Sequence, residues 1–217
     1  MNHPIRRLAL NVLAVLALPG FAAGLDPTLG QRGKLLLEEK FEGAAVPAGW
    51  TRNTGKISVT DGVMHASELA SDNHIGAFRK AVPVRDCIVQ LDCKFAGATM
   101  FHLGFDPEKG ELKKKGHLFA VAITPDGWAL NENIDKADPK SKTIVHAKAA
   151  TKFEPGQWFT LMLEMKGNDV AVHVAGKPPL RANAKDFHVK KPGLVFRVGG
   201  KDAQEVLIDN LKVWELR

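Results

Sequence analysis

The chain has 217 residues, of which 45% are hydrophobic and 25% charged, with a formal net charge of +6. This balance is too mild to demand a nucleic-acid partner. The one basic cluster, Lys109–Lys115, contains acidic residues and no aromatic ring that could stack on a base. We interpret it as a solvated loop and expect no nucleic acid as a partner, with an anionic partner of another kind as the alternative.

The first residues predict export. Two arginines precede a short apolar run at 8–18, and small residues follow it. This is the layout of a secretory signal peptide, and the run is shorter than the roughly 20 residues of a membrane-spanning helix. We expect a signal peptide at 1–23, cleaved between Ala22 and Leu25, and a periplasmic or secreted domain at 24–217 without a stable membrane anchor. An uncleaved anchor is the alternative.

The rest of the chain reads as short strands. Apolar or alternating runs recur between turn signals such as Asp61–Gly62, Pro125–Gly127 and Gly167–Asp169, without a long helical period. About a dozen strands without helices form a closed barrel or a two-sheet sandwich, and the length suits one domain. We expect coil or a short helix at 25–33 and a loop at 137–142. The expected strands are 35–41, 56–60, 63–67, 74–80, 87–95, 99–105, 117–124, 128–131, 143–147, 157–165, 170–174, 193–198 and 205–216.

The two cysteines lie on one expected strand. Cys87 and Cys93 share a parity with the apolar residues between them. Six residues along a strand span about 20 Å, which is beyond the reach of a disulfide. We therefore expect two free thiols that point into the core.

The last expected strand changes phase. Val206 and Ile208 have one parity, Leu211 and Val213 the other, and Asp209–Asn210 stands between them. One extra residue in a strand resets the side-chain direction, so we predict a β-bulge at Asp209–Asn210. A strand buried on both faces is the alternative.

Several segments together resemble the concanavalin A-like, laminin-G-type jelly rolls. Leu37–Phe41 is similar to their acidic-aromatic opening strand, Pro47–Trp50 to their Gly-Trp pair and Val59–Val63 to their hairpin. The resemblance covers nearly all of the expected mature chain and implies an all-β sandwich of two curved antiparallel sheets. Further similar segments are 156–158, 170–174, 193–195 and 206–214.

Within these jelly rolls, the chain is most similar to the exported 3-keto-disaccharide hydrolase type of domain, long a domain of unknown function. The resemblance implies a carbohydrate partner, either a polysaccharide or a modified disaccharide. That type often carries Asn-Ser-Gly-Ile on a central strand, where this chain has Phe101–Phe105. No catalytic residue is therefore carried over from it.

In such jelly rolls the ligand lies on the concave sheet or at its rim, so outward polar side chains are candidates. Imidazole, amide and guanidinium groups can bond sugar hydroxyls, and a histidine can transfer protons near neutral pH. A plain solvent-facing sheet residue is the alternative for each. The candidates for ligand binding are Arg79, Gln90, Lys94, Trp128 and His146, and those for catalysis are Asp92, His102 and His117.

Trp128 follows a turn and is the best candidate for an exposed sugar-stacking platform, whereas Trp158 and Trp214 are expected in the core. No cofactor is expected, because metal-ligand spacings are missing. Loop acids at Asp106, Glu108, Asp135 and Asp138 leave calcium open without a fixed loop pattern.

Enzymatic signals are sparse. Jelly-roll glucanases usually show a Glu-x-Asp-x-x-Glu triplet, and lyases of this shape use Tyr with His; the chain has no such triplet and no tyrosine. We therefore predict an exported domain that binds a glycan or cell-envelope saccharide on its concave face. A hydrolase or lyase acting on 3-keto or otherwise modified glycosides, and a protein–protein scaffold, are the alternatives.

Overall fold

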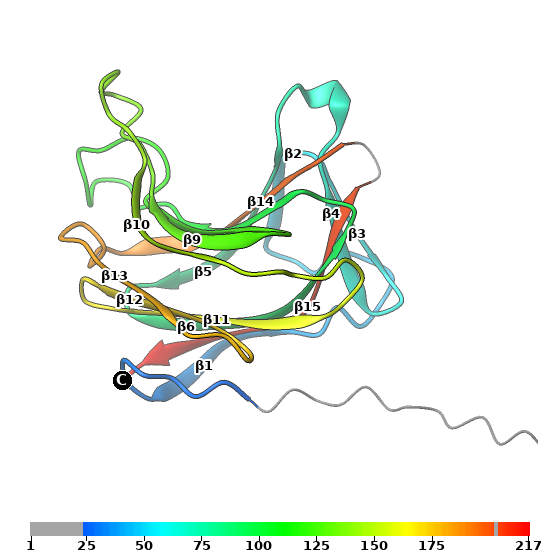
Figure 1. Cartoon of the computed structure of the whole chain (residues 1–217), viewed down its shortest axis with the longest axis horizontal. Coiled ribbons are helices and arrows are strands. Elements are labelled where there is room, and N and C mark those ends of the chain that lie inside the picture. The colour runs from blue at the N-terminus through cyan, green and yellow to red at the C-terminus, as the bar shows by residue number, and fades with distance from the viewer. Residues whose placement is uncertain (1–23, 202–203) are drawn as a thin grey trace, which may run out of the picture.

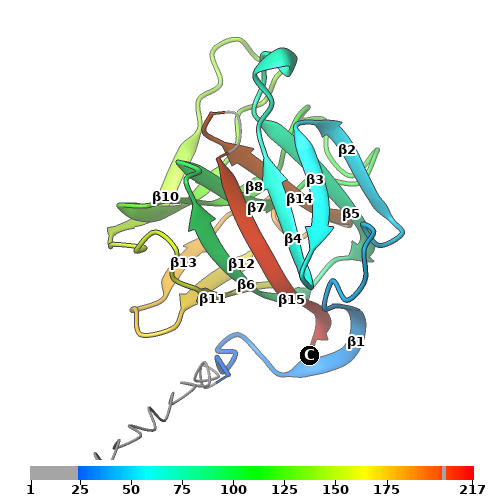
Figure 2. The same ribbon diagram turned by 90° about the vertical axis from the view of Figure 1, so that its right-hand side faces the viewer.

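The computed structural model describes residues 24–201 and 204–217, which fold into two antiparallel sheets stacked face to face (Figure 1 and Figure 2). The first sheet has the order β13-β12-β11-β6-β15-β4-β3, and β1 also pairs with β15. Its strands are β1 (Arg32–Glu39), β3 (Lys56–Thr60), β4 (Val63–Ser67), β6 (Cys87–Ala96), β11 (Phe159–Lys166), β12 (Asp169–Val174), β13 (Leu180–Asn183) and β15 (Glu205–Leu216).

The second sheet has the order β10-β9-β8-β7-β14-β5-β2. It faces the first across the core, as the predicted all-β jelly-roll sandwich requires. A 3₁₀ turn, η1 (Ala70–Asp72), precedes β5. The strands are β2 (Trp50–Thr54), β5 (Gly76–Val84), β7 (Met100–Phe105), β8 (Phe119–Thr124), β9 (Gly127–Glu132), β10 (Ile144–Ala150) and β14 (Lys191–Gly199).

Two strands escaped the sequence prediction, and both lie at sheet edges. β2 closes one edge of the second sheet, and β13 closes one edge of the first. β2 has one apolar residue, Trp50, and β13 has only four residues, with Leu180 and Ala182 facing the core, so neither strand gives a strong local signal. The segment 25–31 forms no helix. In the described part of the chain, no helix is long and apolar enough to cross a bilayer. The predicted signal peptide lies outside the described residues.

The core is built from the inward parity of both sheets, and it includes both cysteines. Cys87 and Cys93 are fully buried on β6 and free, as predicted. Burial raises the pKa of the Cys87 thiol to about 12, so it behaves as a small apolar group.

The hairpin signals of the sequence are also confirmed. Asp61 and Gly62 both have positive φ, 52° and 74°, and join β3 to β4, a backbone conformation that suits a two-residue turn. Gly167, with φ of 58°, begins the turn from β11 to β12, and Pro125–Asp126 joins β8 to β9.

The predicted bulge in β15 is present and marks a change of partner. Before it, Glu205–Ile208 pairs with β4, and after it Leu211–Leu216 pairs with β1. On its other edge, β15 pairs with β6 on both sides of a register shift between Asp209 and Lys212. Asn210 has a φ of 50°. The extra residue lets both halves of β15 face the same core.

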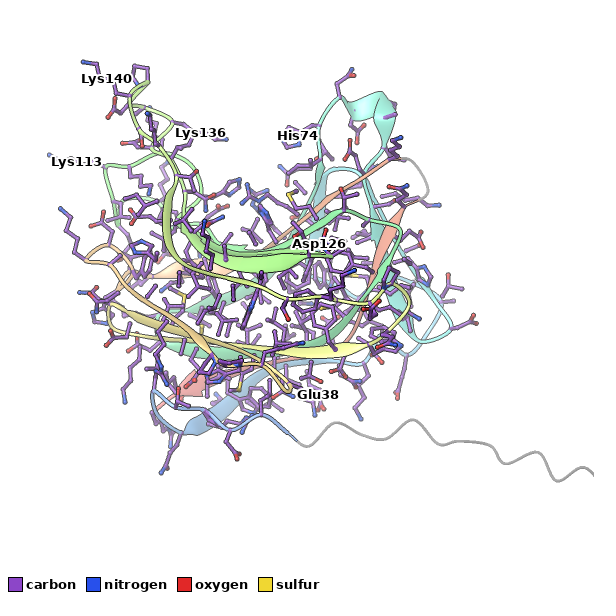
Figure 3. All side chains as sticks on the ribbon, viewed as in Figure 1. Glu38, His74, Lys113, Asp126, Lys136 and Lys140 are labelled. Atoms are coloured by element: carbon purple, nitrogen blue, oxygen red, sulfur yellow. The ribbon has the colours of Figure 1, made fainter. Side chains whose placement is uncertain are left out.

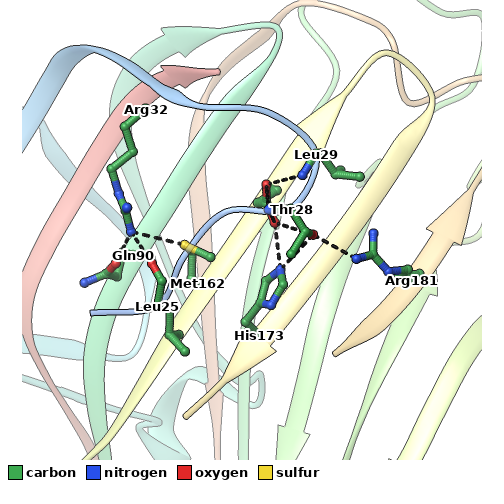
Figure 4. A network of polar contacts seen from close by, with 9 residues as sticks. Leu25, Thr28, Leu29, Arg32, Gln90, Met162, His173 and Arg181 are labelled. Atoms are coloured by element: carbon green, nitrogen blue, oxygen red, sulfur yellow. Dashed lines mark hydrogen bonds and ion pairs between the residues drawn. The ribbon is translucent and has the colours of Figure 1, made fainter. Parts of the chain in front are cut away.

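A segment before β1 covers part of the outer face of the first sheet (Figure 4). The backbone N–H groups of Thr28 and Leu29 donate to the carboxylate of the fully buried Glu164, at 2.9 and 2.8 Å. Burial alone would raise the pKa of Glu164, but hydrogen bonds from His173 and from these amides lower it. Nearby, Arg181 donates to the Thr28 hydroxyl at 2.9 Å. This face is therefore partly occupied by the chain itself.

Candidate functional site

The outer face of the second sheet carries very small residues at its centre. Gly104, Ala120, Ala122 and Ala129 take neighbouring outward positions on β7, β8 and β9. Cross-strand partners in register point to the same face of a sheet. Gly104 and Ala120 are buried, and the side chains of His117 and Arg197 lie next to them.

A hollow of about 460 Å³ lies on this outer face. The loop between β9 and β10 borders one side, and the segment between η1 and β5 borders the other. Figure 3 shows Lys136 and His74 on these two rising segments. The residues that line the hollow are Asn53, Thr54, His74, Ile75, Ala77, Arg79, His117, Asn133, Ile134, Lys136, Thr143 and Arg197.

A hydrogen-bonded chain of polar groups runs along one wall. Arg79 donates from Nε to Asp106 Oδ2 at 3.0 Å and from one terminal nitrogen to Asn53 Oδ1 at 2.6 Å. The other oxygen of Asp106 lies 2.5 Å from His117 Nδ1. Burial by itself would raise the pKa of Asp106, but His117 and then Arg79 lower it below its ordinary value. Within the described residues, His117 Nε2 makes no hydrogen bond.

Arg197 on β14 contributes a further positive charge to the hollow. It donates to Asn133 Oδ1 at 3.3 Å, and it forms no ion pair within residues 24–201 and 204–217. Burial lowers the pKa of the guanidinium, Asp106 opposes that effect and Arg79 adds to it.

His102 is the register neighbour of Arg197 on β7. Burial, followed by the charges of Arg197 and His117, lowers the pKa of His102 from 6.5 to about 3. Its imidazole is therefore neutral near pH 7 and can both donate and accept.

Three buried polar side-chain atoms have no hydrogen-bond partner in the described part of the chain: His102 Nδ1, Asn131 Oδ1 and Asn133 Nδ2. His102 and Asn131 belong to strands β7 and β9 of the second sheet, and Asn133 lies in the loop after β9. By register, His102 and Asn131 lie on its outer face, and Asn133 lines the hollow. Buried polar groups are normally paired, so such a cluster indicates missing partners.

Of the predicted site residues, the structure brings together Arg79, His102 and His117 on this face. Gln90, Asp92 and Lys94 instead lie on β6, on the outer face of the first sheet. They do not join the histidines.

Each of the β6 side chains already has a partner. Gln90 accepts a hydrogen bond from Arg32 at 3.1 Å (Figure 4). Lys94 Nζ lies 4.8 Å from the centre of the Trp158 ring. Asp92 accepts from Thr160 Oγ1 at 2.6 Å and from Asn210 Nδ2 at 3.0 Å, so it supports the bulge of β15.

The tryptophan predictions are corrected by the structure. Trp128 is only 3% exposed, because its parity on β9 turns it inward with Leu130, so it offers no platform for a sugar. Trp158, expected in the core, is 44% exposed because it lies just before β11 begins. Trp214, also expected in the core, packs on the outer face of the first sheet, with Arg32 5.1 Å from its ring centre.

His146 lies away from the residues that line the hollow. Its Nε2 is 3.2 Å from Glu132 Oε2, and its ring packs edge-on against the buried Phe187, with centroids 5.7 Å apart. These contacts give His146 a place at the rim of the core.

Three of the four loop acids considered for calcium bind other groups, among them Asp106, which is held by Arg79 and His117. Asp135 accepts from the backbone of Lys115 and Ala137, at 2.9 and 2.8 Å, and Asp138 accepts from the backbone of Lys140. In the part of the chain that the structure describes, no group of three or more His, Cys, Asp or Glu side chains could hold a metal ion.

Sequence reasoning missed Asn53, Asn131, Asn133 and Arg197. Two signals could have indicated them. Small residues alternate with large ones along β8, which marks an outward face of small side chains. Arg197 is a lone charged residue within an otherwise apolar strand core.

Comparisons with known proteins identify the fold. No family model and no curated protein matches the sequence. The structure is similar to the carbohydrate-binding module CBM66 from Bacillus subtilis, with a TM-score of 0.61 and 14% identity over 77% of this chain and 96% of that one. It is also similar to SCLam, a non-specific endo-β-1,3(4)-glucanase of family GH16, with a TM-score of 0.61 and 13% identity over 85% and 91% of the two chains.

A Bacillus subtilis protein of unknown function with a galectin-like fold is similar as well, with a TM-score of 0.65 and 15% identity over 87% and 99% of the two chains. At these identities the similarities show a shared fold alone. That fold is the concanavalin A-like jelly roll, as the sequence predicted. The closer resemblance to the 3-keto-disaccharide hydrolase type stays a prediction.

Proposed function

We propose that the chain is an exported carbohydrate-binding domain that holds a saccharide in the hollow on the second sheet. The observation that carries the proposal is a set of unpartnered polar atoms at the hollow and on the same outer face: Asn133 lines the hollow, and His102 and Asn131 lie on the outer face of the sheet. A buried group without a hydrogen bond costs about 1–3 kcal/mol. Sugar hydroxyls both donate and accept, so one sugar can satisfy an imidazole nitrogen, an amide oxygen and an amide nitrogen together.

The size and lining of the hollow support this proposal. Its volume of about 460 Å³ lies within the range of small-molecule sites, and Ile75 and Ile134 add apolar surface beside the polar groups. A carbohydrate-binding module and a glucanase are among the proteins that share the fold. A shared fold does not imply a shared function, so the proposal rests on the geometry of the hollow.

Binding is better supported than glycosidase chemistry. Two carboxylates that face one cleft are required for acid–base cleavage of a glycosidic bond. No carboxylate lines the hollow, and the nearby Asp106 is held by Arg79 and His117.

A glycan array followed by calorimetric titration of the best ligand tests the proposal. Each hydrogen bond contributes about 1 kcal/mol, so His102→Ala and Asn133→Ala should each weaken binding about fivefold. The controls Gln90→Ala and Lys94→Ala, on the opposite face, should bind like the unmodified protein. Loss of binding in the controls alone would place the site on the first sheet. If no glycan on the array binds, carbohydrate binding is refuted, and the protein–protein scaffold is the remaining hypothesis.

His117 favours a second candidate function, a hydrolase or lyase acting on 3-keto or otherwise modified glycosides. Asp106 orients its Nδ1, and Nε2 is unpartnered in the described part of the chain, an arrangement that suits a general acid or base. Turnover of a 3-keto-glycoside that disappears in His117→Ala, while ligand affinity persists, would establish this function. Unchanged turnover in that variant would refute the role of His117.

A further inference from the structure

The hollow carries more positive than negative charge. Arg79, Lys136 and Arg197 line it, and no aspartate or glutamate does. Arg79 is neutralised from the side by Asp106, at 3.0 Å. Lys136 and Arg197 make no ion pair within the described residues. The hollow therefore presents a surplus of positive charge to whatever enters it.

Arg197 is partly buried and lies at the centre of the sheet. By register its side chain stands on β14 between Ala77 of β5 and His102 of β7, so it belongs to the floor of the hollow. A half-buried guanidinium without an ion pair is costly, because the one hydrogen bond to Asn133, at 3.3 Å, replaces only part of the solvation that burial removes. An anionic group is the partner that best restores it, since guanidinium binds oxyanions through two parallel hydrogen bonds.

A simple inorganic anion would not account for the rest of the site. The hollow is far larger than one such ion, it contains Ile75 and Ile134, and unpartnered amide and imidazole atoms lie beside Arg197. These groups match the hydroxyls and ring of a sugar. No phenylalanine, tyrosine or tryptophan, the large rings on which nucleic-acid bases stack, lines the hollow.

We propose that the saccharide bound in the hollow is acidic, and that its carboxylate or sulfate group binds Arg197 while its hydroxyls bind His102 and Asn133. This inference rests on the proposed carbohydrate-binding function. Lys136, on the rising loop, adds long-range attraction, which makes the binding sensitive to salt.

Calorimetric titration with matched tetrasaccharides tests the inference. The ligands are cellotetraose, which is neutral, the corresponding β-1,4-linked glucuronate tetrasaccharide, and a sulfated cellotetraose. The unmodified protein should bind at least one anionic form about tenfold or more tightly than cellotetraose at low salt, and Arg197→Gln should abolish that preference. The form that is preferred identifies the group as carboxylate or sulfate.

Two further variants keep the test decisive. Arg197→Lys keeps the charge and should retain part of the preference, which separates a lost charge from a folding defect. Arg217→Gln removes an exposed arginine that is paired with Glu215 at the end of the first sheet, and it should behave like the unmodified protein.

The outcomes separate the two proposals. Equal affinity for neutral and anionic forms, unchanged in Arg197→Gln, would overturn the acidic ligand while carbohydrate binding stands. Binding of none of the three would count against both. Competition by inorganic sulfate at the same concentration as the tetrasaccharide would show a bare anion site and would overturn the saccharide.

Discussion

His102 is a neutral imidazole on the outer face of a sheet whose inner face is packed with apolar side chains. Burial lowers its pKa to about 3 in the folded protein, against 6.5 ordinarily. As the pH falls from about 6.5 toward 3, His102 therefore binds a proton in the unfolded chain but not in the folded protein. The contribution of the neutral histidine to the free energy of unfolding is highest above this pH range and decreases as the pH falls through it.

We therefore expect His102→Gln to be less sensitive to acid than the unmodified protein. Between about pH 7 and pH 4, the unmodified protein should lose a few kcal/mol more free energy of unfolding than the variant. Urea unfolding at both pH values measures this difference. Carboxylates such as Asp106 and Glu164, whose pKa values are lowered by folding, also lose stability as the pH falls, but they do so in both proteins. Equal losses would contradict a depressed His102 pKa.

At the residue scale, parity predicted the direction of many side chains. It placed Cys87 and Cys93 inside and Gln90 and His102 outside, and the structure agrees. Trp128 was expected to be exposed because it follows a turn. Its parity is that of the buried Leu130, and this parity indicates the inward direction that the structure shows. The position of an aromatic ring next to a turn is a weaker guide than its alternation with neighbours.

At the scale of elements, β15 is one strand that serves two partners. Its bulge separates the half that pairs with β4 from the half that pairs with β1. Asn210 adopts the left-handed conformation there and donates from its amide to Asp92 at 3.0 Å. The polar pair Asp209–Asn210 thus gave a reliable signal, because short polar side chains can bond the groups that a bulge frees.

Substitution of Asn210 tests this account of the bulge. Asn210→Val should destabilise the protein by about 1–3 kcal/mol, because a β-branched residue is strained at positive φ. Asn210→Gly should cost less, since glycine adopts this conformation freely. Thermal and urea unfolding measure both. Valine tolerated as well as glycine would mean that the bulge relaxes at little cost.

The segment before β1 depends on one buried carboxylate. Glu164→Gln should weaken its hold on Thr28 and Leu29, because hydrogen bonds to a charged group contribute about 1.5–3 kcal/mol and those to a neutral group less. Amide hydrogen exchange at Thr28 and Leu29 should then become about tenfold faster or more. The control Glu215→Gln should leave it unchanged. Unaltered exchange in Glu164→Gln would show that packing alone holds the segment.

At the scale of the whole molecule, the two outer faces differ in what covers them. The first sheet is partly covered by the segment 25–31, and its polar residues on β6 are paired. The second sheet carries a hollow that is lined by one residue with an unpaired group, Asn133, and has two more unpaired groups, on His102 and Asn131, on the same outer face. Within the described residues, this face therefore offers both room and unpaired polar groups to a ligand.

The fold could be predicted from the sequence more fully than the site. Alternation along a strand reports which side chains point outward, but not which sheet the strand joins. β6 and β7 are consecutive, yet they belong to different sheets, so Gln90 and His102 point outward on opposite faces of the molecule. Arg79 and Arg197 come together through the pairing of β5 with β14, strands far apart in the sequence, which no local pattern contains. His117 joins them from the segment just before β8.

The central claim is that the hollow on the second sheet is the ligand site. Nuclear magnetic resonance of the ¹⁵N-labelled protein, titrated with the best glycan from the array, tests it most directly. We predict that chemical-shift changes concentrate on β5, β7, β14 and residues 133–143. Chemical-shift changes centred on Gln90, Lys94 and Trp158 at the first sheet, without changes at the residues that line the hollow, would contradict this claim.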